Sequence, residues 1–412
     1  SLFQSRPYTG VAVKNELAAM EPLQQHPSRP LRIFISTGDV MGDMHGASLT
    51  EAFFKQAELD HNNIEVYALG GHGMKAAGAV LIGDNSGLSA VGIIEALPLV
   101  FPSLCLHTVV RYFLQKHPPD IVVLIDYPGV NIPFGKYVKK IFGCKLIYYI
   151  PPNEWQWNTA RTNAIVRMSD LILSNYPHEL LYYKQAGANV MFVGHPLIDK
   201  HKHLSQKEAR SKIGVKADDL VIALIPASRE QELRDVWPLI ASAAKYLSNI
   251  SKTHRRLMHF FVPVVLPKHR KTFMDSLEKH GLLNDVQLWF GEPHVVMAAA
   301  DIAITKSGSV NLELALHNVP QVVLYRIGKI SNWICRTFFS PPTLISLVNV
   351  ILGYQLVPEF IQDEATPEKI ADAAMKLLPL TGNDNLERIK MLDGYKELHR
   401  LLGKPGVATK AA

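Results

Sequence analysis

The segment "LRIFISTGDVMGDMHG" (residues 31–46) places an apolar run directly before a glycine-rich turn, an order typical of a β-strand that leads into a helix. The turn combines glycines with two carboxylates, and these residues are Gly38, Asp39, Gly42, Asp43 and Gly46. Glycine-rich turns often bind phosphate through backbone N–H groups, but two aspartates would repel an anion. The spacing also matches neither the dinucleotide fingerprint nor the phosphate loop, so the ligand has to be inferred from the rest of the chain.

The same alternation of β-rich runs and amphipathic segments continues from residue 31 onward, as in βαβ units around a parallel sheet. Strands are expected at 31–36, 64–70, 120–125, 145–150, 171–174 and 190–194, and in a second series at 220–226, 259–266, 286–291, 301–305 and 321–326. A polar segment rich in His and Lys (195–214) separates the series. This predicts an α/β fold with two doubly wound Rossmann-like domains facing a cleft.

The domain boundaries follow from this pattern. We expect a disordered leader remnant at 1–30, an N-terminal domain at 31–197, a C-terminal domain at 198–385, and a C-terminal helix and tail at 386–412. Packing of that tail back on the N-terminal domain is one option. No apolar run reaches the roughly 18 residues that span a bilayer.

Composition indicates a folded globular chain, since 48% of its 412 residues are hydrophobic and 19% are charged. The net charge is +6, but Lys and Arg are spread along the sequence, so nucleic acid is not indicated, whereas an anionic substrate or a membrane surface is compatible. The cysteines Cys105, Cys144 and Cys335 are far apart, which favours a reducing compartment and packing roles.

Residues directly after the strands are the candidates for function, because ligands of doubly wound sheets bind there. Asp126 in "LIDYPGVN" (124–131) ends an almost wholly apolar strand, where a carboxylate suits a general base. The alternative is a structural Asp126 bonded to a neighbouring loop. For the opening turn, the structural alternative is that Asp43 caps the helix carrying "ASLTEAFFKQA" (47–57).

Two segments of the second series carry positive charge. In "IPASREQEL" (225–233), Arg229 beside Ser228 is a diphosphate candidate because it stays charged and offers a fork of donors; a surface Arg is the alternative. In "TKSGSVNLELALHNVP" (305–320) a helix N-terminus suits phosphate, and its residues are Lys306, Ser307, Gly308 and Ser309. Glu313 suits ribose hydroxyls, or is simply a favourable acid near a helix start.

These candidates predict a division of labour: the second domain binds a nucleotide diphosphate, and the first holds and deprotonates a neutral hydroxyl. Neither an Asp-x-Asp pair nor a His cluster offers an obvious metal site, so we expect no metal and no cofactor.

A series of segments from about residue 31 to 402 then points to one family. The segments are "STGDVMGDMHGASL" (36–49), "LSAVGIIEAL" (88–97), "LIDYPGVN" (124–131), "YYIPPNEWQW" (148–157), "FVGHPLID" (192–199), "IPASRE" (225–230), "SGSVNLELAL" (307–316) and "SLVNVILGYQLVPEFIQ" (346–362). In this order they resemble the lipid-A-disaccharide synthases, inverting glycosyltransferases of the two-domain B fold.

The resemblance implies that Asp126 is the catalytic base and that UDP-2,3-diacylglucosamine is the donor, with the corresponding monosaccharide 1-phosphate as acceptor. Around the donor it implies Arg229, Glu313, Asn349, Glu359 and Gln362, which join Ser228 and the residues at 306–309. The candidates for the acceptor side or the cleft are Gly38, Asp39, Gly42, Asp43, Gly92, Glu95, Trp155, Trp157 and His195.

Departures from the family pattern leave the natural acceptor open. They are Asp39, Met41, Pro151, Asn153, Glu154, Ala227 and Val348. The variant loops resemble the cyanobacterial and plastid branch, which favours a plastid or another organelle over a bacterial-type cytoplasm. Alternatives to the family activity are a B-fold UDP-sugar transferase or epimerase with another acceptor, and a nucleotide-binding relic without turnover.

A membrane contact is the last expectation. In "VGIIEALPLVFPSLCL" (91–106), Ile93, Leu97, Phe101 and Leu104 are among the apolar residues that recur at helical spacing, and the family places a membrane-touching helix here. Core packing is the alternative, and a homodimer is left open.

Overall fold

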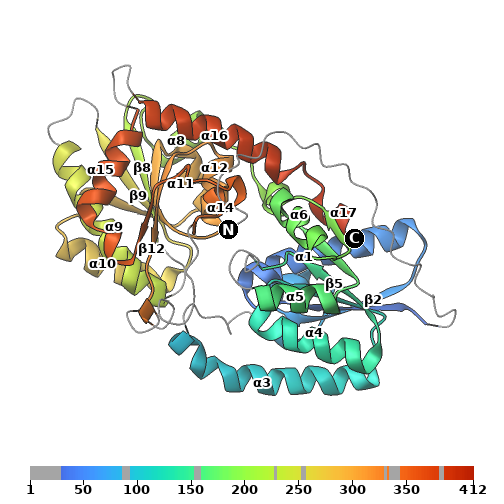
Figure 1. Ribbon diagram of the computed structural model, residues 1–412. Coiled ribbons are helices and arrows are strands. Elements are labelled where there is room, and N and C mark those ends of the chain that lie inside the picture. The colour runs from blue at the N-terminus through green and yellow to red at the C-terminus, as the bar shows by residue number, and fades with distance from the viewer. Residues whose placement is uncertain are drawn as a thin grey trace. The chain divides into compact units, whose positions relative to one another are not determined.

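The computed structural model describes residues 29–85, 93–152, 159–226, 230–251, 257–328, 332–333, 344–379 and 385–412. The described residues form two compact units (Figure 1). The N-terminal unit takes in residues 29–199 and 401–412, and the C-terminal unit takes in the described residues from 200 to 400.

The N-terminal unit is built on a seven-stranded parallel sheet with strand order β3-β2-β1-β4-β5-β6-β7. Its strands are β1 (Leu31–Ser36), β2 (Ile64–Gly70), β3 (Val80–Asp84), β4 (Ile121–Ile125), β5 (Lys145–Tyr149), β6 (Leu171–Ser174) and β7 (Val190–Phe192). Its helices are α1 (Val40–Leu59), α2 (His72–Ala76), α3 (Ile93–Lys116), α4 (Pro128–Phe142), α5 (Thr159–Met168), α6 (Pro177–Gln185), α7 (Leu197–Lys200) and α17 (Val407–Ala411).

The C-terminal unit repeats the architecture with a six-stranded parallel sheet of order β10-β9-β8-β11-β12-β13. Its strands are β8 (Leu220–Ile225), β9 (Met258–Pro263), β10 (Val286–Trp289), β11 (Ile302–Lys306), β12 (Gln321–Tyr325) and β13 (Glu359–Ile361). Its helices are α8 (Gln206–Ile213), α9 (Glu230–Ser251), α10 (Arg270–Lys279), α11 (Pro293–Ala299), α12 (Val310–Leu316), α14 (Leu347–Leu352), α15 (Pro367–Leu377) and α16 (Leu386–Leu402), with 3-10 turns at Pro267–His269 and Gln362–Glu364.

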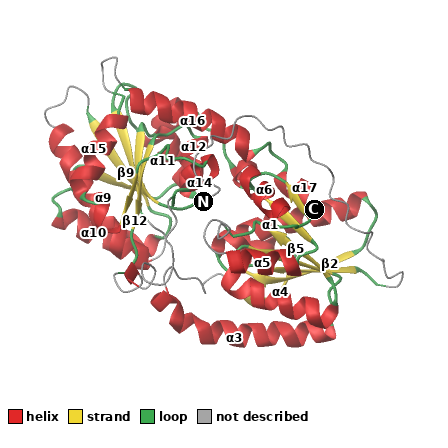
Figure 2. Cartoon of the chain, viewed as in Figure 1, coloured by secondary structure: helices red, strands yellow, loops and turns green. Residues whose placement is uncertain are grey.

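Each sheet lies between helices, as Figure 2 shows, and this explains the composition of the central strands. Every residue of β4 ("IVVLI") and of β8 ("LVIALI") is buried. A strand covered on both faces contacts apolar neighbours on both, so it needs a continuous apolar run and not an alternating one. The α/β fold class with two parallel-sheet domains is therefore confirmed.

All the strands expected from the sequence are present, and the structure adds two. β3 has exposed residues at both of its ends, and β13 has only 3 residues, none of them buried. Both strands lie at a sheet edge, where the pattern of apolar residues is weak. Local periodicity therefore did not reveal them.

The last residues of the chain contribute to the N-terminal unit. α17 packs on α1, and the carboxylate of Asp199 accepts hydrogen bonds from the backbone N–H groups of Gly406 at 2.6 Å and Ala408 at 3.1 Å. The backbone N–H of His195 donates to the carbonyl of Leu402 at 2.9 Å. These contacts hold residues 401–412 beside the segment that follows β7.

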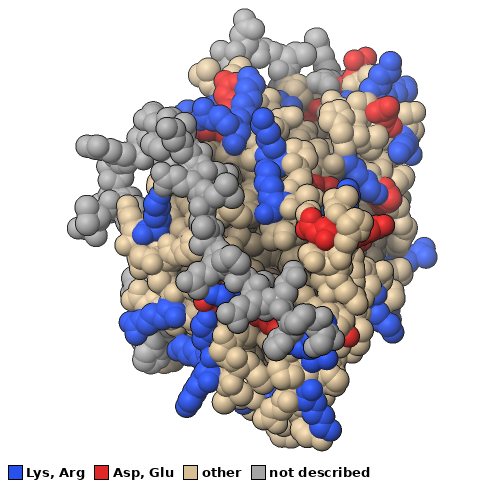
Figure 3. Space-filling view, turned by 90° about the vertical axis from the view of Figure 1, so that its right-hand side faces the viewer, with Lys and Arg blue, Asp and Glu red and all other residues tan. Residues whose placement is uncertain are grey.

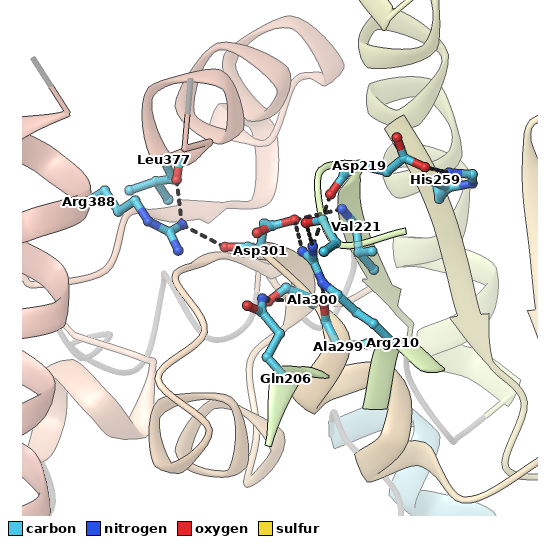
Figure 4. Close-up of polar contacts among 11 residues, drawn as sticks. Gln206, Arg210, Asp219, Val221, His259, Ala299, Ala300, Asp301, Leu377 and Arg388 are labelled. Atoms are coloured by element: carbon cyan, nitrogen blue, oxygen red, sulfur yellow. Dashed lines mark hydrogen bonds and ion pairs between the residues drawn. The ribbon is translucent and has the colours of Figure 1, made fainter. Parts of the chain in front are cut away.

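A buried ion pair ties the first helix of the C-terminal unit to its sheet (Figure 4). Arg210 on α8 donates to Asp301 at 2.6 Å, and the two side chains are only 7% and 8% exposed. Asp301 also accepts from the backbone N–H of Val221 in β8, and its own carbonyl accepts from Arg388 of α16 at 2.7 Å. The turn before β11 therefore anchors α8, β8 and α16 together.

The surface mixes charges of both signs. On the face in Figure 3, Lys and Arg side chains are interspersed with Asp, Glu and uncharged residues. Cys144 is buried, as expected for a packing residue. Cys105 is exposed on α3, so the prediction of a packing role is wrong for Cys105. Cys335 lies outside the described residues. Within the described part of the chain, no helix has the length and apolar character to cross a membrane.

Candidate functional site

The carboxyl edge of the N-terminal sheet brings two of the motifs together. β1 and β4 are neighbours, and the chain leaves them toward opposite sides of the sheet, which creates the crevice where doubly wound folds bind ligands. Gly38 follows β1, and Asp126 and Tyr127 follow β4. A Cβ built on Gly38 would lie 1.9 Å from Cγ of Tyr127, so only glycine fits against this ring. The two loops are thus in direct contact.

The backbone at this edge is unusual. Asp126, Tyr127 and Ile150 have positive φ angles of 45°, 48° and 55°. Left-handed backbone is disfavoured for side chains with a Cβ, and most of all for a β-branched residue such as Ile150. The N–H of Asp126 donates to the carbonyl of Ile150 at 3.1 Å, so a hydrogen bond joins two of the strained residues. Strain of this kind is concentrated at functional sites.

A buried amide holds the Asp126 loop in place. Asn131 in the first turn of α4 is fully buried, and its Nδ2 donates to the carbonyls of Ile125 at 3.0 Å and Asp126 at 2.9 Å. Its Oδ1 accepts from Oγ of Ser36 at the end of β1 at 2.8 Å. The Tyr148 hydroxyl donates to the same Asp126 carbonyl at 2.8 Å. Asn131 was not among the candidates, although it closes the "LIDYPGVN" segment.

Asp126 itself is exposed, in contrast to the buried strand before it. A carboxylate in that position is accessible to a substrate hydroxyl. Glu179 on α6 is a buried acid whose charge interacts with that of Asp126. Burial raises the pKa of Glu179 well above the usual range, and the negative charge of Asp126 adds to the shift. One oxygen of Glu179 accepts from the N–H of Asn175 at 2.9 Å, and this contact favours the charged form of the carboxyl group.

The carboxylates of the opening turn serve backbone amides. Asp39 caps α1, because its Oδ1 accepts from the N–H of Gly42 at 2.7 Å. The prediction that Asp43 caps α1 is therefore wrong. Asp43 is buried and instead accepts from the start of α2, from the N–H groups of Gly71 at 2.8 Å, Gly73 at 2.8 Å and Met74 at 3.1 Å. The two aspartates thus take the amide positions that an anion would otherwise occupy.

His195 is buried and stacks on Tyr176, with the ring centroids 5.5 Å apart. Burial, helped by the neighbouring His45, lowers its pKa to about 3, so the ring is neutral near pH 7. Its Nδ1 accepts from the N–H of Leu197 at 3.2 Å. The ring therefore packs within the N-terminal unit, just after β7, and its place on the acceptor side stays a prediction.

In the C-terminal unit, the candidate phosphate segment is partly occupied by its own chain. The N–H of Gly308 donates to Oδ1 of Asn311 at 2.9 Å, and the Ser307 hydroxyl donates to the carbonyl of Ile345 at 3.0 Å. Lys306 is the last residue of β11, and Ser309 immediately precedes α12. The segment therefore lies at the carboxyl edge of its sheet, as expected, but with fewer open donors.

Glu313 on α12 contrasts with this. Its side chain is half-buried, desolvation raises its pKa, and no hydrogen bond or ion pair holds its carboxylate within the described part of the chain. It is thus a carboxyl group available to accept from a ligand hydroxyl.

The other expected donor residues shape a loop. Oδ1 of Asn349 accepts from the N–H groups of Leu356 at 2.7 Å and Val357 at 2.9 Å, and its Nδ2 donates to Glu359 at 2.7 Å. Glu359 also accepts from the N–H of Ser346 at 2.7 Å, at the start of α14. These side chains fold the segment onto itself.

Gln362 has a positive φ of 53°, and its amide pairs with the backbone of Ile327, accepting from its N–H at 3.0 Å. It links the end of β13 to the segment after β12.

Several candidates fall elsewhere. Gly92, Trp155, Trp157, Ser228 and Arg229 lie outside the described residues, and Glu95 lies in α3 with its side chain outside the described part. Among the described residues, no group of three or more His, Cys, Asp or Glu is arranged to hold a metal ion.

Comparison with known proteins gives consistent matches over nearly the whole chain. The family profile described as lipid-A-disaccharide synthetase matches residues 33–403. Lipid-A-disaccharide synthases of Gloeothece citriformis and Prochlorococcus marinus are each 40% identical, over 93% of this chain and 98% and 97% of theirs.

Solved structures of similar fold include a putative UDP-N-acetylglucosamine 2-epimerase from Listeria monocytogenes, with a TM-score of 0.60, 14% identity and coverage of 93% of this chain and 95% of that one. The glycosyltransferase of kitacinnamycin matches with a TM-score of 0.59 and 14% identity, over 93% of this chain and 97% of that one. At such low identity these structures support the fold alone.

Proposed function

Because the chain belongs to the lipid-A-disaccharide synthase family, a family of glycosyltransferases, we propose that it transfers a 2,3-diacylglucosaminyl unit from a UDP-sugar to an acylated glucosamine 1-phosphate. The proposal depends on the position of Asp126. This residue is an exposed carboxylate on strained backbone, and it lies where the chain leaves β1 and β4 toward opposite sides of the N-terminal sheet. UDP-sugar is a substrate here, and the proposed reaction uses no cofactor.

In this mechanism Asp126 takes the proton from the acceptor hydroxyl. The hydroxyl oxygen forms a bond to the anomeric carbon as the bond from that carbon to the diphosphate oxygen breaks, and UDP leaves with the electron pair. Attack from the face opposite the leaving group inverts the anomeric centre. A positioned base of this kind contributes roughly 10²–10⁴-fold.

The donor would be held by groups of the C-terminal unit. Glu313 is suited to accept from a ribose hydroxyl, because its carboxylate is half-buried and open to a ligand. Arg229 remains the candidate for the diphosphate, since a guanidinium pairs with two phosphate oxygens at once. Asn349 and Glu359 would act through the loop that they fold, and not by direct contact alone.

Replacement of Asp126 by Asn tests the proposal. The variant should bind UDP-sugar in calorimetry and keep its melting temperature, while UDP release on the best acceptor falls by about 10²–10⁴-fold. Asp60→Asn is the matched control, because Asp60 is an exposed aspartate of the same unit at the end of α1. Wild-type turnover in Asp126→Asn would show that Asp126 is not the catalytic base. UDP binding without turnover on any acceptor in the wild-type protein would indicate a relic.

We also propose that α3 contacts a membrane surface. Phe101, Leu104 and Tyr112 are exposed by 74%, 61% and 60%, an unusual display of large apolar groups on one helix. Phe101→Ser with Leu104→Ser should reduce vesicle binding and leave the melting temperature unchanged. Leu114→Ser, in the buried side of the same helix, should lower the melting temperature instead. Undiminished vesicle binding by the first variant would exclude α3.

A plastid location is the finer proposal on localisation. It is supported by the identity of 40% to cyanobacterial relatives against 31% to that of Geobacter metallireducens. Fractionation of source cells, with the protein followed by antibody, tests it; recovery outside plastids would exclude it.

A further inference from the structure

The outer face of the N-terminal unit has a groove that the proposed reaction does not use. It lies between α4 and α5, which run side by side in Figure 1, and has a volume of about 600 Å³. Its lining consists of Lys136, Lys139 and Lys140 from α4, and Ala160, Asn163, Ala164, Arg167 and Met168 from α5.

The sequence spacing explains why the groove is hollow. Ala160 and Ala164 lie four residues apart and therefore on one face of α5, where their methyl groups leave room between longer side chains. Asn163 and Arg167 form a second row at the same spacing. Met168 is buried, with its sulfur 2.9 Å from a Cβ built on Gly135 of α4, so it closes the floor.

The lining is strongly positive and contains no carboxylate. Lys139 is neutralised, since its ammonium group pairs with Asp170 and also donates to the carbonyl of Cys144. In the described part of the chain, no hydrogen bond or ion pair engages Lys136, Lys140 or Arg167. Three cations around one hollow repel one another, and a bound anion would relieve this repulsion.

Helix ends do not account for all of this charge. Lys140 and Arg167 lie in the last turns of α4 and α5, where a cation favours the helix dipole. Lys136 is a turn earlier and gains nothing from that effect. The groove therefore carries more positive charge than the helix dipole explains, and its lining holds no acid to balance that charge.

The groove is also separate from the carboxyl edge. α4 starts at that edge with Pro128, and a helix rises about 1.5 Å per residue, so Lys136 and Lys140 lie roughly 12–18 Å along it. A ligand here does not compete with the chemistry at Asp126.

We propose that this groove binds a phosphate group. Arg167 offers a fork of donors for two phosphate oxygens, Lys136 and Lys140 supply point charges, and Asn163 adds a neutral donor. The phosphate belongs either to a soluble molecule or to the headgroup of an anionic lipid. In both cases the ligand has the same recognition chemistry.

The test compares two double variants that each remove two positive charges from exposed sites of the same unit. Lys136→Gln with Arg167→Gln alters the groove, and Lys55→Gln with Lys75→Gln alters α1 and α2. Inorganic phosphate is titrated into each full-length protein by calorimetry, with saturating UDP present to fill the donor site. The groove variant should bind phosphate at least tenfold more weakly, and the control should change less than twofold.

Sedimentation with phosphatidylcholine vesicles, with and without phosphatidylglycerol, identifies the source of the phosphate. If the groove variant, but not the control variant, loses the binding that depends on phosphatidylglycerol, the ligand is a lipid headgroup. If the groove variant loses only the binding of inorganic phosphate and still binds these vesicles, the ligand is a soluble molecule. Equal effects of the two variants in both assays would overturn the proposal, as would absence of any binding by the wild-type protein. Melting temperatures of both variants should match the wild type, since the altered side chains are exposed.

Discussion

Replacing Asn131 with Ala tests whether one buried amide holds the carboxyl edge of the N-terminal sheet. The amide accepts from the Ser36 hydroxyl at 2.8 Å and donates to the carbonyls of Ile125 at 3.0 Å and Asp126 at 2.9 Å. Truncation to Ala leaves the Ser36 hydroxyl and the Ile125 carbonyl without the amide as a hydrogen-bond partner. The Asp126 carbonyl keeps the Tyr148 hydroxyl at 2.8 Å.

The expected loss of stability follows from these contacts. A buried polar group without its partner costs about 1–3 kcal/mol, and two such groups therefore lower the free energy of unfolding by roughly 2–6 kcal/mol. Since total stabilities are about 5–15 kcal/mol, a loss near the lower end of this estimate leaves the variant folded. Urea unfolding followed by fluorescence measures the change, and a wild-type midpoint would refute the hydrogen-bond argument.

Turnover provides a second measurement on the same variant. Asn131 sets the backbone of Asp126, and a displacement of about 1 Å in a reacting group costs on the order of 100-fold. Tyr148→Phe is the matched control, because it removes only one of two donors to the same carbonyl and should cost about 0.5–1.5 kcal/mol. A folded Asn131→Ala enzyme that releases UDP at the wild-type rate would contradict the positioning role.

Further predictions concern stability. Asp43→Ala leaves the buried N–H groups of Gly71 and Met74 at the start of α2 without their acceptor and should lower the free energy of unfolding by about 2–6 kcal/mol in urea; an unchanged midpoint would contradict it. The folded-state pKa of His195 is lowered to about 3, so its contribution is present above pH 6.5 and is lost as the pH falls. His195→Gln should therefore reduce the acid slope of stability by about 1.4 kcal/mol per pH unit, and equal slopes would refute this. The pKa of Glu179 is raised, so the stability of the wild-type protein falls as the pH rises above about 4.5; Glu179→Gln has no such proton to lose and should therefore gain stability relative to wild type as the pH rises above that value, measured by urea unfolding. Arg210→Met leaves Asp301 buried without its ion pair and should cost about 3–5 kcal/mol, measured by the same unfolding assay.

The strand pattern could be predicted because burial on both faces leaves a continuous apolar run, as in β4 and β8. The edge strands β3 and β13 were missed because neither is buried on both faces, so neither needs a continuous apolar run. Candidate residues were found by their positions after strands, because a parallel sheet gathers the ends of its strands at one edge.

The role of each carboxylate could not be predicted in this way. Asp39 bonds an amide three residues away, whereas Asp43 bonds amides at Gly71 and Met74, 28 and 31 residues away. The two side chains stand in almost the same local sequence. Only the packing of α2 against α1 decides which of them caps which helix.

By itself, the sequence determined the two α/β units, the strands in the interior of each sheet and the family, because these depend on local periodicity and on motifs in series. The tertiary structure alone decided that Asp126 sits on left-handed backbone held by Asn131, and that Asn349 and Glu359 bond to their own loop. It also decided that the cations of α4 and α5 surround one hollow. Hydrogen-bond partners and charge clusters join residues that are distant in the chain, and their free energy depends on burial that no single segment encodes.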